Sequence, residues 1–170
     1  MDFDAAAAII AGLIGGAIMV VPLYMGIVMM PSQMKMNLFL LLGTMMLTSK
    51  PMAYATGGTT SPNKPLAYAA GAMVHAAMSI GFALIHVAVF VAFDLETELA
   101  AWGVLFGAIH WVIVGMGLGM MRFMHPLIRS GEMDDPGAFA LKFPAMTAIG
   151  FFMLHIVFGV LVAVFYELLA

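Results

Sequence analysis

Residues 99–121 read LAAWGVLFGAIHWVIVGMGLGMM, and none of them is Asp, Glu, Lys or Arg. An α-helix needs about 20 apolar residues to cross the hydrocarbon of a bilayer. This stretch therefore predicts a membrane-spanning helix. Acidic residues precede it, at Glu96 and Glu98, and the basic Arg122 follows it.

Three further apolar stretches are long enough to span a bilayer, at residues 5–30, 66–93 and 139–168. The chain is 64% hydrophobic and 9% charged, with a mean hydropathy of +1.09, whereas a soluble domain is about 25% charged. The sequence therefore predicts an all-α, polytopic membrane protein. We expect four transmembrane helices in a single domain that covers residues 1–170.

A shorter apolar segment lies at residues 37–48, between Lys35 and Lys50. About a dozen residues are too few to cross the hydrocarbon, and a stretch of this length is more often interfacial or re-entrant. We predict one short helix of that kind.

The basic residues fall in two polar segments, 31–65 and 122–142, and the ends opposite to them carry only acids. Basic loops face the cytoplasm. Both segments are therefore expected there, with the N- and C-termini on the non-cytoplasmic side. The six basic residues are Lys35, Lys50, Lys64, Arg122, Arg129 and Lys142.

Glycines recur at a spacing of four residues, in the pairs Gly12/Gly16, Gly103/Gly107 and Gly115/Gly119. Such pairs allow two helix backbones to approach closely in lipid. Packing within one bundle is the favoured interpretation, and a dimer face is the alternative.

Four histidines, His75, His86, His110 and His155, lie inside the predicted spans, where ionisable side chains are functional candidates. Small residues share the helical stripes of His110 and His155, so we expect both to face the bundle interior and to contact each other. One interpretation is structural, with each imidazole bonded to a neighbouring helix. The other is haem b, with axial ligands from His110 and His155 and a second site at His75 and His86.

Methionine is unusually frequent, with 19 residues, and it favours a third interpretation. Thioether and imidazole ligands select Cu(I). The candidate copper ligands in the cytoplasmic half are His75, His125, Met78, Met120 and Met121. The alternative is that methionine is a flexible apolar filler.

The sequence favours a non-enzymatic role. It contains no cysteine and no nucleophile with an adjacent base, and it lacks the basic cluster of a nucleic-acid-binding protein. We predict a subunit or accessory factor that lies in the lipid bilayer with protein partners, in a membrane complex or a homo-oligomer. A redox or metal-binding protein is the first alternative, and a small-substrate channel formed by an oligomer is the second.

Three short motifs, Gly107–Trp111 (GAIHW), Asn37–Met46 (NLFLLLGTMM) and the His155-x-x-x-Gly159 pair, carry a resemblance. They are similar to motifs of an uncharacterised family of small bacterial four-helix membrane proteins, a domain of unknown function. The resemblance implies a four-span fold and no activity. With the charge pattern, it leads us to expect the bacterial inner membrane.

Overall fold

The computed structural model describes residues 2–47 and 64–170. Four helices in it are long and apolar enough to cross a membrane: α1 (Ala5–Met29), α3 (Lys64–Ala92), α4 (Leu99–Met124) and α6 (Ala145–Leu169). Three shorter elements accompany them: α2 (Leu38–Leu47), α5 (Pro126–Arg129) and the 3₁₀ helix η2 (Ala138–Ala140). The described residues contain no strand, so the predicted all-α architecture with four spans and a short helix is confirmed.

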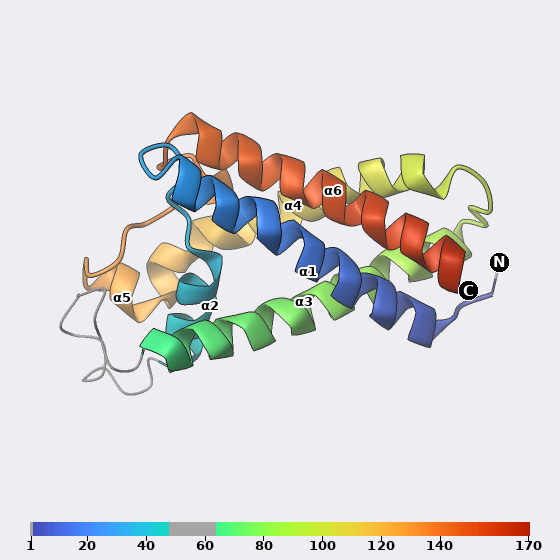
Figure 1. Cartoon of the computed structure of the whole chain (residues 1–170), viewed down its shortest axis with the longest axis horizontal. Helices are drawn as coiled ribbons and strands as arrows, with labels where there is room; N and C mark the ends of the chain where they lie inside the picture. The colour runs from blue at the N-terminus through green and yellow to red at the C-terminus, as the bar shows by residue number, and fades with distance from the viewer. Residues whose placement is uncertain (1, 48–63) are drawn as a thin grey trace.

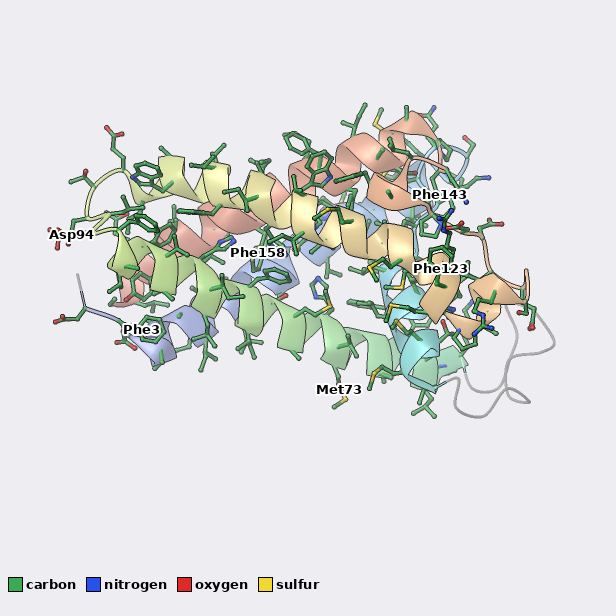
Figure 2. All side chains as sticks on the ribbon, turned by 180° about the vertical axis from the view of Figure 1, so that it is seen from behind. Phe3, Met73, Asp94, Phe123, Phe143 and Phe158 are labelled. Atoms are coloured by element: carbon green, nitrogen blue, oxygen red, sulfur yellow. The ribbon has the colours of Figure 1, made fainter. Side chains whose placement is uncertain are left out.

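The four long helices form a bundle in which α1 packs against both α3 and α6, and α4 packs along α6 (Figure 1). Both termini lie at one end, and α2 lies at the other (Figure 1). Helices α3 and α4 are close at their connection near Asp94 and separate toward the opposite end, where α2 lies between them (Figures 1 and 2). The bundle is therefore wedge-shaped on its α3–α4 side.

Glycine brings the long helices into backbone contact. A Cβ at Gly103 would lie 2.5 Å from the carbonyl oxygen of Gly159, and one at Gly12 would lie 2.7 Å from the carbonyl oxygen of Ser79. Any larger residue would push α4 from α6, or α1 from α3, since packed helices do not yield without shifting. The predicted packing of the glycine pairs within the bundle is thus confirmed.

Helix α2 lies tightly against the first turns of α3, and Asn37 fixes its beginning. The Oδ1 of Asn37 accepts bonds from the backbone amide of Leu40 (3.1 Å) and the hydroxyl of Tyr24 (3.0 Å). Its Nδ2 donates to the hydroxyl of Tyr68. One side chain therefore caps α2 and ties it to α1 and α3. The helix matches the predicted segment 37–48; Thr48 and Lys50 lie outside the described residues.

Two predicted boundaries differ from the observed ones by more than two residues. Helix α4 continues three residues past the predicted end, to Met124. Helix α6 begins at Ala145 and not at residue 139, because Pro144 disfavours the helical conformation in the residue before it. Upstream of that proline the chain forms η2, with Phe139 at a φ of 55°. The ring of Phe139 packs against Gly115 of α4.

The two ends of the chain are joined by Tyr166, which is fully buried. Its hydroxyl donates to the carbonyl oxygen of Asp2 (2.8 Å) and accepts from the amide of Asp4 (3.0 Å). The carboxylate of Asp4 in turn caps α1 by accepting from the amide of Ala7 (2.9 Å). The first span is therefore held at its start by the last one.

The outer surface of the bundle is apolar, as expected of a protein in lipid. Met73 points away from the helices and is 74% exposed, whereas Phe158 lies between them and is 1% exposed (Figure 2). The polar side chains His86, His110 and His155 are turned inward and buried. The bundle is thus integral to a membrane by its length and its surface.

Candidate functional site

A partly open cavity of about 60 Å³, the inner cavity, lies between the spans, next to α2. Three of the four intramembrane histidines line it: His75 of α3, His110 of α4 and His155 of α6. Most of the remaining wall is apolar. Its other residues are Met19, Leu23, Met36, Leu38, Leu42, Met78, Ser79, Phe82, Val114, Phe151, Leu154 and Phe158.

The close crossing of α4 and α6 places two of these histidines side by side. A Cβ at Gly107 would lie 2.5 Å from the carbonyl oxygen of His155, so the two backbones nearly touch at this level. The rings of His110 and His155 meet edge to face, with centres 4.8 Å apart. Their exposed fractions are 7% and 6%. The predicted inward orientation and mutual contact of this pair are confirmed.

The tautomer of His155 follows from its hydrogen bond. Its Nδ1 lies 2.6 Å from the carbonyl oxygen of Phe151, one helical turn earlier. A carbonyl oxygen can only accept, so Nδ1 carries the hydrogen and Nε2 carries the lone pair. His155 thus has one ring nitrogen held by the backbone and one with a lone pair for a further partner.

His110 is less satisfied. Phe82 stacks on its ring with centres 3.6 Å apart, and His86 meets it edge to face at 5.7 Å. Three ring nitrogens are buried without a hydrogen-bond partner: Nδ1 of His110, Nδ1 of His86 and Nε1 of Trp111. An unpaired buried polar atom costs about 1–3 kcal/mol. Such atoms are rare in folded proteins and indicate strain, a bound group or ordered water.

His75 lies between two hollows of the surface. Besides the inner cavity, it lines a groove of about 350 Å³ between α1 and α3, together with Ser79 and Phe39. The hydroxyl of Ser79 donates to the carbonyl oxygen of His75 (2.8 Å) and packs against Gly16 of α1. The small residues of α1 therefore set the position of the α3 face that carries His75.

A haem does not fit this geometry. Two axial imidazoles, each about 2 Å from the iron through nitrogen, would place their ring centres about 6 Å apart with the macrocycle between them. His110 and His155 are closer and touch directly. The cavity of about 60 Å³ is also far below the roughly 300–1,000 Å³ of pockets for organic ligands. His86 lies outside its wall, and His75 is separated from His86 by three turns of α3.

The structure divides the five predicted copper ligands. His75 and Met78 line the inner cavity. Met120 is 55% exposed on the outer face of α4, and Met121 packs in a separate cluster near Ile128. His125 is fully buried beside α2 and α5. The predicted set therefore does not converge on one point.

Both ring nitrogens of His125 are engaged by the protein. Its Nδ1 accepts from the amide of Leu127 (3.2 Å), and its Nε2 lies 3.1 Å from the carbonyl oxygen of Leu41. Nε2 must therefore carry the hydrogen. Burial lowers the pKa of His125 below its ordinary value of 6.5, and the bond to Leu41 opposes this in part. His125 is a neutral structural residue that joins the end of α4 to α2.

Sequence reasoning missed two contributors to the site. Met36, 5% exposed, lies in the connection between α1 and α2 and reaches into the cavity. Thr147 holds that connection to α6, since its hydroxyl donates to the carbonyl oxygen of Gln33 (2.7 Å) and accepts from the amide of Lys35 (3.2 Å). No sequence pattern marks Met36 or Thr147 as part of the site. The neighbouring Asn37 could have been recognised, because an asparagine before an apolar run is a typical helix N-cap.

Comparison of the chain with family models, with curated proteins and with solved structures finds no match.

Proposed function

We propose that this chain is a non-enzymatic integral membrane protein of the bacterial inner membrane that serves as a subunit or accessory factor of a larger membrane assembly. As part of the same proposal, the chain is a member of the uncharacterised family of small four-helix membrane proteins that its short motifs resemble. The observation that carries it is the outer face of α4. The other described residues leave most of this face uncovered.

Helix α4 is the least covered of the four spans. Of its most apolar 18 residues 22% are buried, against 28% for α3, 39% for α6 and 44% for α1. Its outer stripe combines flexible side chains with Gly117, whose missing Cβ would have no atom within 4 Å. Glycine in such a stripe permits close approach of another helix, and methionine adapts to its surface. The exposed stripe consists of Ile109, Ile113, Met116 and Met120.

The distribution of charge supports a defined orientation in the membrane. The basic residues among the described ones lie at the α2 end of the bundle. The opposite end, around Asp94 (Figure 2), carries acids. Basic ends face the cytoplasm, so the termini belong on the outer side. The basic residues at the α2 end are Lys35, Lys64, Arg122, Arg129 and Lys142.

Photo-crosslinking in native membranes tests whether the exposed stripe of α4 is a docking face, that is, a surface that contacts a partner protein. A photoreactive amino acid at Ile113 or Met116 should give an adduct with another membrane protein, identified by mass spectrometry. The same label at Met73, which is exposed on α3, is the matched control and should give none. An adduct with twice the mass of the chain would show that α4 contacts a second copy, and it would contradict the accessory role in favour of a homo-oligomer. Equal labelling from α3 and α4 would remove the docking face altogether.

The docking face has a second, substitution-based test. Gly117→Leu should abolish the adduct formed from Met116, because the side chain fills the space that the partner helix would occupy. Gly81→Leu on α3 is the control, since a Cβ at Gly81 also meets no atom within 4 Å. Neither change collides with the chain itself at Cβ. Loss of the adduct in both variants would indicate a general defect and contradict a specific α4 contact.

A further inference from the structure

We propose that the inner cavity binds a single soft monovalent metal ion, Cu(I), through the imidazoles of His110 and His155 and the thioethers that line the same cavity. This site lies inside the bundle and is independent of the α4 docking face, so each proposal can fail without the other. The donors differ from those that sequence spacing had grouped together.

The size of the cavity limits what it can hold. A cavity of about 150 Å³ lined by apolar side chains accommodates benzene, and this one has about 60 Å³. An aromatic or larger organic ligand is therefore too big. One ion with its ligands supplied by the wall fits the volume.

One of the two histidines, His155, is held as metal-binding histidines usually are. A metal-binding imidazole typically donates its other N–H to a carbonyl or carboxylate, which fixes the ring and the tautomer. His155 does so through Nδ1, at 2.6 Å from the carbonyl oxygen of Phe151. Its lone pair is on Nε2. His110, in contact with it, is 7% exposed and has an Nδ1 without a partner.

The kind of metal follows from the donors that are present and those that are missing. Residues 2–47 and 64–170 contain no group of three or more His, Cys, Asp or Glu that could hold a metal ion. The cavity wall also contains no carboxylate or thiolate, the ligands that commonly complete a Zn²⁺ site. Two imidazoles completed by thioethers match the preference of Cu(I). Met19 and Met36, 9% and 5% exposed, are the buried thioethers of the wall.

Met36 lines more than one cavity. It lines a second cavity of about 150 Å³ at the α2 end of the bundle. Met133 and the carboxylate-bearing Asp134 lie in the wall of that outer cavity. Lys35 lies in the same wall, so this outer cavity carries charges of both signs. Met36 thus lies between this outer cavity and the inner one.

The direct test uses the full-length protein in detergent under anaerobic conditions. Cu(I) is titrated in competition with a chromophoric Cu(I) chelator, and X-ray absorption is recorded on the loaded protein. We expect one equivalent of tightly held Cu(I), with both nitrogen and sulfur in the first coordination sphere. Zn²⁺ in excess should not displace it. Absence of a tight equivalent, or its displacement by Zn²⁺, would overturn the proposal.

Variants locate the ion. Met36→Leu conserves volume and should weaken Cu(I) binding about tenfold or more, since groups that merely orient a ligand already contribute about 10–100-fold. His155→Gln should abolish the stoichiometric equivalent. Met120→Leu, at an exposed thioether outside the cavity, is the matched control and should leave affinity unchanged. If the two variants Met36→Leu and Met120→Leu bind Cu(I) with equal affinity, Met36 does not bind the ion, and the proposed site in the cavity is wrong. If His155→Gln does not fold, the X-ray absorption spectrum of the wild-type protein still tests whether nitrogen and sulfur bind the ion.

Discussion

The hydroxyl of Thr44 lies 3.1 Å from Nε2 of His125, across 81 residues of sequence. Thr44 donates its own hydrogen to the carbonyl oxygen of Leu40 (2.6 Å), so its oxygen accepts from the imidazole. Both side chains are fully buried. The pair therefore connects the short helix α2 to the chain after α4, at the end of the bundle where α3 and α4 are furthest apart.

The His125 contact makes the stability of the protein depend on pH. The unfolded chain takes up a proton near pH 6.5, whereas burial keeps His125 neutral in the fold. Stability from this residue is therefore constant above that pH and falls as the pH drops below it. Thermal unfolding in detergent, from about pH 8 to about pH 5, should show a smaller acid-induced decrease for His125→Asn than for the wild type. Taking the difference between the two removes the contribution of the other histidines. Identical pH profiles would mean that His125 is not buried as a neutral imidazole.

The crossing of α4 and α6 should tolerate no side chain at Gly107. A Cβ there would lie 2.5 Å from the carbonyl oxygen of His155, so Gly107→Ala must separate the helices at a cost of about 1–3 kcal/mol. Gly81→Ala meets no atom within 4 Å and should change stability by no more than about 1 kcal/mol. Thermal or denaturant unfolding in matched micelles measures both. Equal effects of the two substitutions would contradict the close crossing.

Asn37 should control the order of α2. Asn37→Ala removes the cap on the amide of Leu40 and leaves the hydroxyls of Tyr24 and Tyr68 without this partner. We expect a loss of about 1–2 kcal/mol, localised to α2. Hydrogen–deuterium exchange should become faster in residues 38–47 while α6 keeps its protection. Asn37→Asp retains the capping oxygen and should exchange more slowly than Asn37→Ala in the first turn of α2. Uniformly faster exchange over all helices would argue against a local cap.

The orientation of the bundle can be read from single cysteines, because the chain has none of its own. In intact cells, Ser130→Cys should be protected from an impermeant thiol reagent, since it lies at the basic end. Thr97→Cys, at the acidic end, should be labelled. Both should react after the membrane is made permeable. The reverse pattern in intact cells would place the termini in the cytoplasm.

The parts of the structure that depend on length and periodicity were predictable from the sequence. The four spans follow from apolar length, and the contact of His110 with His155 follows from their stripes of small residues. The start of α6 was missed, since the break imposed by Pro144 lies in a stretch that is still apolar. The predicted copper ligands were chosen because they lie in the same half of the membrane. The structure separates them, since Met120 is exposed on the outer face of α4 and His125 is buried against α2. Met36 could not be assigned, because a residue between two helices has no periodicity to give its direction.

The bond from Tyr166 to Asp2 and Asp4 sets an order for biosynthesis. During translation α1 enters the membrane while α6 has not yet been made, so one of the two helices that cover α1 is missing until α6 follows. Until then the small-residue face of α1 toward α6 is open to lipid or to an insertion factor. This bundle closes only when α6 arrives, and a ribosome that stalls before Tyr166 would leave a membrane intermediate in which the start of α1 is not held.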